Sequence, residues 1–171
     1  MKSLLNSFSA LLLFCFYFVN AREKPNLIYI VCDDLGYGDL GCYGQKVIKT
    51  PRFDLMAKEG LRFTDHYAGH TVCRPSRLVY LVGKHTGHTA IAGNNMHILP
   101  KGSVTVTSLL KEAGYRTGGV GKWALGHLGT TGHPNKQGFD FFYGYLDQSE
   151  AHDYYPEHLY RNGTKERLSL I

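Results

Sequence analysis

The chain has 171 residues, of which 43% are hydrophobic and 19% are charged, and its formal net charge is +5. This length allows one domain with a sizeable hydrophobic core. The mild positive balance suits an anionic substrate, but there is no basic run with interleaved aromatic residues, so nucleic acid is not an expected partner.

The first 21 residues have the features of an export signal. Lys2 supplies the positive start, an apolar stretch runs from Leu4 to Val19, and the small residue Ala21 ends the segment. A membrane anchor is the alternative, but the stretch is short for a span and lacks the usual flanks. We therefore expect a secreted or periplasmic protein, lysosomal or extracellular in a eukaryote, with no stable membrane anchor. Residues 22–171 then form the folded part.

The remaining chain alternates between strand-like and helix-like patterns. Residues 26–32 form an apolar run typical of a buried strand in a parallel sheet. Thr50-Pro51 begins a helix that Gly60 ends. The next elements expected are a strand over 61–66, helices over 73–82 and 104–113, and a strand over 115–121. From Gly126 onward the pattern indicates long loops with short elements. This order predicts an α/β fold with a mostly parallel sheet flanked by helices.

One cysteine, Cys73, stands where a helix is expected to begin, in the run Cys-Arg-Pro-Ser-Arg over 73–77. Pro75 suits the first helical turn, where its missing N–H costs nothing. The positive end of a helix dipole favours anions and thiolates, and Arg77 lies one turn further on. The run therefore indicates an anion site with a reactive atom at its centre, although a structural cysteine in a proline-capped helix is the alternative.

Two adjacent carboxylates, Asp33 and Asp34, directly follow the first expected strand. Ligands of open α/β sheets bind beyond the carboxyl ends of the strands. Paired carboxylates repel each other unless a cation joins them, and hard oxygen ligands favour calcium or magnesium. The alternative is a pair of solvated turn residues.

Three cysteines remain once the expected signal is removed, so at least one is unpaired unless a second chain takes part. Cys32 and Cys42 either form a disulfide or stay as buried thiols. Asn162-Gly163-Thr164 is a glycosylation sequon, relevant only in a eukaryotic host.

Several motifs occur in the order found in the type I sulfatases, which the chain resembles from Lys24 to Lys165. The run at 73–77 matches the core Cys-x-Pro-Ser-Arg in full. In the family's trailing Leu-Thr-Gly-Arg, this chain has Val82 and Lys84 in place of Thr and Arg. The other matches are Asp-Asp-Leu-Gly-Tyr-Gly-Asp-Leu over 33–40, Gly-Lys-Trp-Ala-Leu-Gly over 121–126, and the stretch 135–155.

The resemblance implies an alkaline phosphatase-like fold and hydrolysis of a sulfate ester. It implies that a formylglycine-generating enzyme oxidises Cys73 to formylglycine, whose hydrated aldehyde is the nucleophile. Asp33, Asp34 and residue 73 would hold calcium, and Arg77 and Lys122 would bind the sulfate and stabilise its developing charge. The implied substrate is a sulfated small molecule or glycan.

The chain also departs from the family pattern. Ala124 stands where the family usually has a histidine that contacts formylglycine, and His127 is a weak substitute. The later part of the family's chain carries an Asp-Asn pair, a lysine and a histidine that complete the site, and no such motif precedes Ile171. The resemblance therefore implies the N-terminal portion of a catalytic domain, incomplete at its C-terminal side and inactive alone.

Three further histidines are candidate site residues. His152, with the nearby tyrosines, either lines a substrate pocket or only contributes to packing. The same two alternatives apply to His85 and His88. Two other functions remain open: a phosphodiesterase or phosphonate hydrolase of the same superfamily, and a non-catalytic truncated fragment.

Overall fold

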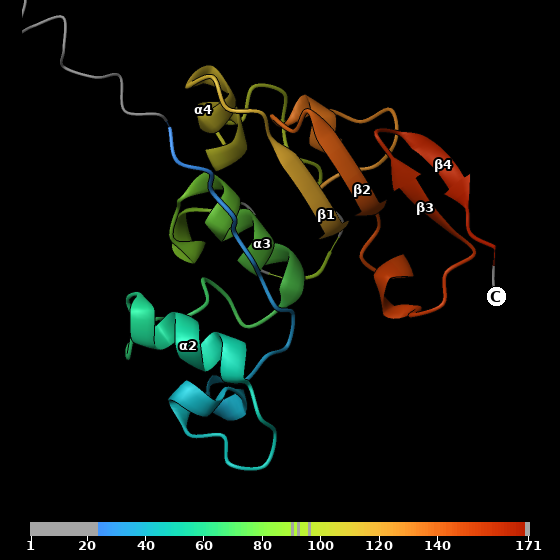
Figure 1. Cartoon of the computed structure of the whole chain (residues 1–171). Helices are drawn as coiled ribbons and strands as arrows, with labels where there is room; N and C mark the ends of the chain where they lie inside the picture. The colour runs from blue at the N-terminus through green and yellow to red at the C-terminus, as the bar shows by residue number, and fades with distance from the viewer. Residues whose placement is uncertain (1–23, 90, 92, 96, 170–171) are drawn as a thin grey trace, which may run out of the picture.

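The computed structural model describes residues 24–169, apart from residues 90, 92 and 96 (Figure 1). The expected export signal over 1–21 lies outside the described residues. The α-helices are α2 (Pro51–Glu59), α3 (Cys73–Val82) and α4 (Val106–Glu112). The strands are β1 (Gly118–Lys122), β2 (Phe141–Tyr145), β3 (His158–Arg161) and β4 (Thr164–Arg167). Short 3₁₀ turns join them, including Tyr37–Asp39, Gly41–Tyr43 and Glu150–His152.

Helix boundaries follow the capping signals in the sequence. Gly83 ends α3 with φ 62°, a left-handed conformation that glycine adopts without strain. At the start of α4, the Thr105 hydroxyl accepts from the Ser108 N–H at 3.0 Å. Ahead of α2, the Thr50 hydroxyl accepts instead from the Gly41 N–H at 2.8 Å, so this residue ties the glycine-rich loop to the helix.

The sheet is mixed rather than mostly parallel. Its strand order is β1-β2-β3-β4, and only β1 and β2 are parallel, whereas the other two pairs are antiparallel. The α/β class is therefore confirmed, but the expected strand arrangement is wrong for the described residues. The turn at Asn162 and Gly163, with φ 48° and 95°, folds β3 and β4 into a hairpin and so accounts for one of the two antiparallel pairs.

The apolar run 26–32 is not a strand in this structure. It is extended and runs beside α3, and the rings of Tyr29 and Tyr80 have centroids 5.6 Å apart (Figure 1). It pairs with none of the described strands, and its side chains are exposed, with Ile28 at 87%. A strand requires a hydrogen-bonded neighbour, whereas an apolar pattern reports only a preference for apolar surroundings.

The strand expected over 61–66 is also absent. Here backbone carbonyls accept from side chains in place of a ladder: the Tyr43 hydroxyl donates to Phe63 O at 2.8 Å, and the Tyr37 hydroxyl donates to Thr64 O at 3.4 Å. These bonds satisfy the segment as a loop against the glycine-rich region.

The core packs α3 against the segments that follow β1 and β2. Its buried side chains include Leu78 and Leu81 from α3, Trp123 and Leu125 after β1, and Phe142 from β2. The Trp123 indole also donates to Gly132 O at 2.8 Å, so its one polar atom is satisfied. This packing holds the end of β1 against α3, the helix that carries Cys73. Among the described helices, none combines the length and apolar character needed to cross a bilayer.

Replacing Leu125 with alanine tests the core. Leu125 is fully buried, at 0% exposure, so we expect Leu125→Ala to lower the free energy of unfolding by about 2–5 kcal/mol. Leu109→Ala is the control, because Leu109 is 52% exposed on α4 and the change should stay within about 0.5 kcal/mol. Urea denaturation of both variants measures this, and equal losses would contradict the assignment of the core.

Candidate active site

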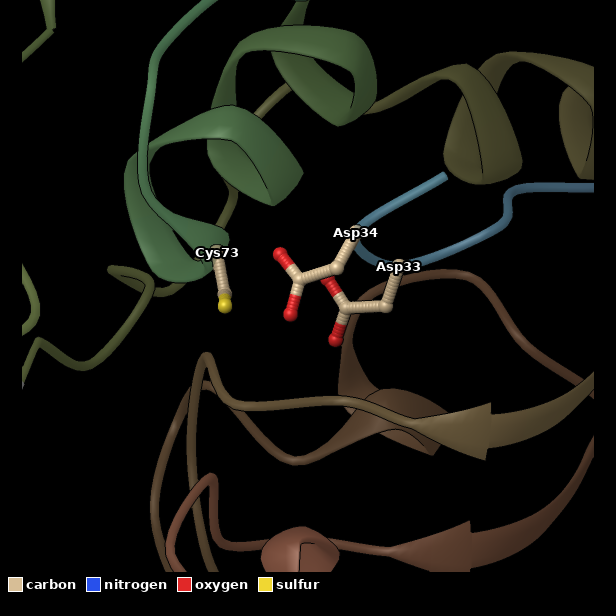
Figure 2. A group of neighbouring side chains, drawn as sticks. All are labelled: Asp33, Asp34 and Cys73. Carbon is tan, nitrogen blue, oxygen red and sulfur yellow. The ribbon is translucent and has the colours of Figure 1, made fainter. Parts of the chain in front are cut away.

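Three residues expected to hold a metal lie together at the start of α3. Figure 2 shows the side chains of Asp33, Asp34 and Cys73 directed toward one another. One ligand atom from each lies within 4.8 Å of the others. Cys73 is the first residue of α3, and the two aspartates form a turn in which Asp34 has φ 58°. Aspartate tolerates this left-handed conformation better than most residues, and the turn brings both carboxylates to one place.

Two cations meet one oxygen of Asp33. Arg77 NH2 lies 3.2 Å from Asp33 Oδ2, and Lys122 Nζ lies 2.9 Å from the same atom. Arg77 stands one turn after Cys73 on α3, and Lys122 is the last residue of β1. The Arg77 guanidinium also donates to the main-chain carbonyl of Lys122, which joins α3 directly to the end of β1. Both cationic side chains are 10% exposed or less, so they are held in place rather than solvated.

These cations change the acidity of Asp33. Partial burial acts to raise the pKa of this carboxyl, but the hydrogen bond from Lys122 and the charges of Arg77 and Lys122 outweigh it and lower the pKa below its usual value. Asp33 is therefore ionised at neutral pH and can act as a ligand for a cation.

A cavity of about 990 Å³ opens beside this cluster. Asp33, Asp34, Arg77 and Lys122 line it, together with apolar side chains from residues 26–31, α3, α4 and the two parallel strands. His152 also lines it, and its Nε2 lies 3.5 Å from Lys122 Nζ. The cavity therefore carries a cluster of charged side chains at the carboxyl ends of β1 and β2.

The residue after Cys73 has a role that the sequence did not reveal. Arg74 is 4% exposed, and its Nε donates to Ala124 O at 2.8 Å while NH1 donates to Asn94 O at 2.6 Å. Asn94 Oδ1 in turn accepts from the Arg74 backbone N–H at 3.1 Å, which satisfies a donor at the helix start. The Cys73 end of α3 is thus fastened to two loops. No sequence signal marks this contact, because the Arg74 side chain donates to main-chain carbonyls.

The weaker candidates lie outside the cluster. Ala124 is buried at 3% and has φ 70°. His127 does not line the cavity, and its Nε2 is 3.8 Å from Asp147 Oδ2. The rings of His85 and His88 contact each other, with centroids 6.1 Å apart, in a 3₁₀ turn that also lies off the cavity.

The structure distinguishes between the two alternatives for Cys32 and Cys42. Cys32 and Cys42 are unpaired, so of the two alternatives the structure has the thiols, and Cys32 is exposed rather than buried. Asp39 accepts from the Gly36 N–H at 2.6 Å within the glycine-rich loop.

Comparison with known proteins shows the family to which the chain belongs. The family model described as "Sulfatase" matches residues 25–168. The chain belongs to the sulfatase family. It is 40% identical over 136 residues to human arylsulfatase D, covering 71% of this chain and 23% of that protein. It is 45% identical over 135 residues to N-acetylgalactosamine-6-O-sulfatase of Bacteroides thetaiotaomicron, covering 72% of this chain and 26% of that one. The chain thus spans about a quarter of the length of these relatives.

Solved structures agree with the family. The structure of Ps i-CgsB superposes with a TM-score of 0.75 at 34% identity, covering 86% of this chain and 38% of that one. A structure described as a complex with its substrate D-glucosamine-2-N,6-O-disulfate gives a TM-score of 0.73 at 31% identity, over 85% of this chain and 28% of that one. The described fold therefore corresponds to part of a sulfatase.

The contact between Lys122 and Asp33 predicts a measurable change in acidity. In Lys122→Met we expect the pKa of Asp33 to rise, because the main hydrogen-bond donor and one of two nearby charges are removed. Carboxyl carbon shifts followed by NMR across the acid range measure this. Lys84→Met removes the same charge from an exposed position beyond α3 and should leave Asp33 unchanged. An unchanged pKa in Lys122→Met would show that the two side chains do not meet in solution.

Proposed function

We propose that residues 22–171 are the N-terminal portion of the catalytic domain of an exported sulfuric ester hydrolase, and that residues 1–21 are its signal peptide. The observation that supports this best is the convergence of Arg77 and Lys122 on a single anionic oxygen, at 3.2 and 2.9 Å, beside Asp34 and Cys73. Two buried cations aimed at one oxygen are what a tetrahedral oxyanion such as sulfate requires.

The residues at this cluster fit calcium once residue 73 carries oxygen. Calcium prefers hard oxygen ligands, so Asp33 and Asp34 suit it, whereas a cysteine thiolate is a soft ligand and does not. A formylglycine formed from Cys73 would replace that sulfur with oxygen in the same position. When present, formylglycine supplies the nucleophile and calcium supplies positive charge at the sulfate.

The chain's own residues then bind and orient the substrate. Lys122 provides a point charge for one sulfate oxygen, and Arg77 provides a planar donor beside it. Because the Arg77 guanidinium also donates to Lys122 O, the two cations keep a fixed spacing while substrate enters. Residue 73 lies at the positive end of α3, which favours the anionic form of its reactive atom and of the bound sulfate.

The proposed substrate is a sulfated glycan or small molecule. Names among the relatives include steryl-sulfatase and N-acetylgalactosamine-6-O-sulfatase, and one solved relative is described in complex with a neocarrahexaose. The partner required for maturation is a formylglycine-generating enzyme. The chain alone, in which the described residues place Asp33, Asp34 and residue 73 at the cluster, is proposed to be inactive.

The maturation step is testable by mass spectrometry. We expect Cys73, alone among Cys32, Cys42 and Cys73, to become an aldehyde that reacts with hydrazide when the chain is coexpressed with a formylglycine-generating enzyme. The reason is the intact Cys-x-Pro-Ser-Arg run, in which Cys73 is not fully buried. A complete sulfatase matured in the same cells is the control, and an intact thiol at residue 73 alongside a converted control would refute the proposal.

Removing one carboxylate should remove the metal. In the matured chain we expect Asp34→Ala to weaken calcium binding by at least about tenfold, because one of few hard ligands is lost. Asp65→Ala is the control, since Asp65 is an exposed loop carboxylate whose one described partner is Thr64. Isothermal titration with calcium chloride measures both variants, and equal affinities would show that Asp34 is only a turn residue.

A further inference from the structure

A histidine to which the proposed function assigns no role lies directly beside Lys122. His152 ends the 3₁₀ turn Glu150–His152, between β2 and β3, and its Nε2 is 3.5 Å from Lys122 Nζ. It lines the same cavity as Arg77 and Lys122 although it comes from a different part of the chain. His152 is thus the one described histidine among the residues that line this cavity.

The position of His152 is set by the backbone around it rather than left to a mobile loop. Tyr145, at the end of β2, lies opposite Lys122 in the parallel pair. Its hydroxyl donates to Asp153 O at 3.2 Å, one residue beyond the histidine. The His152 N–H donates to Ser149 O at 3.0 Å and closes the turn. The strand register and these hydrogen bonds therefore place the His152 imidazole beside Lys122.

The two nitrogens can share an anionic oxygen. Charge-assisted hydrogen bonds run at about 2.7–2.9 Å, and two donors 3.5 Å apart can both reach one oxygen at that length. An ammonium only donates, so Nε2 accepts when Lys122 contacts it directly. An anion between them selects the tautomer with hydrogen on Nε2, which turns the imidazole into a donor.

The exposure of the three groups shows where the imidazole would act. The Arg77 and Lys122 side chains are 10% and 9% exposed, whereas His152 is exposed. His152 therefore lies toward solvent from the two buried cations.

We propose that His152 is a substrate-binding residue, whose Nε2–H donates to a sulfate oxygen on the solvent side of the Arg77–Lys122 pair. This role rests on the proposed sulfatase function. It assigns to the loop after β2 a part in holding the ester, together with the residues that the motifs place there.

The experiment measures sulfate binding to the matured full chain at saturating calcium. Sodium sulfate is titrated by calorimetry, with sodium chloride at equal ionic strength as the reference. We expect His152→Ala to bind sulfate about tenfold more weakly, because one hydrogen bond to a charged group is lost. His152→Gln, which keeps an N–H donor, should recover part of the affinity. His88→Ala is the matched control, since His88 is exposed and lies off the cavity.

A second readout separates contact from a structural effect. With ¹³C-labelled histidine, the His152 ring signals should move with sulfate while those of His88 stay in place. If the parent binds sulfate, and His152→Ala binds it within twofold with no movement of the ring signals, the role of His152 is wrong and the sulfate site stands. If the parent itself binds no sulfate, the assignment of Arg77 and Lys122 as a sulfate site in this chain fails, and the role of His152 fails with it.

Discussion

The contact of Arg77 and Lys122 with Asp33 is the interaction on which the site depends. The aspartate and the lysine are 89 residues apart in sequence, and the arginine and the lysine are 45 apart. One carboxylate oxygen therefore joins the turn after residues 26–32, the first turns of α3 and the end of β1. Because the Asp33 side chain is 40% exposed, solvent screens part of the attraction, and the contact contributes more to geometry than to stability.

In the proposed function, the same arrangement accounts for a chemical change at Cys73 before the cluster holds a hard cation. The helix start gives residue 73 a positive environment, and Arg74 fastens that helix start to Ala124 and Asn94. The position is thus rigid and electrostatically favourable, but sulfur is a poor partner for the two carboxylates and a calcium ion. Replacing sulfur with oxygen at a fixed position changes the ligand chemistry without any movement of the backbone.

The site was more predictable from the sequence than the fold. Asp33, Asp34, Cys73, Arg77 and Lys122 were all expected at one place, and the structure brings them together, because short motifs at strand and helix ends encode local geometry. For His152 the sequence allows both a pocket role and a packing role, because a loop sequence does not indicate which strand end the side chain will lie beside. Arg74 gave no signal because its partners are backbone carbonyls, which every residue has.

The errors in the fold arise where pairing partners decide the outcome. The run 26–32 has the composition of a buried strand, yet strand formation needs a neighbour that its own residues cannot specify. The hairpin of β3 and β4 had a local signal, Asn162-Gly163, that was interpreted only as part of a sequon. An Asn-Gly pair favours a tight turn between strands, so its backbone preference was the more informative property.

A crystal structure of the matured chain grown with calcium and sulfate would test the central claim most directly. Anomalous scattering should place one calcium ion about 2.3–2.6 Å from oxygens of Asp33, Asp34 and residue 73, with the sulfate on Arg77 and Lys122. A calcium ion bound elsewhere, with the two aspartates turned to solvent and no sulfate on the cation pair, would contradict it.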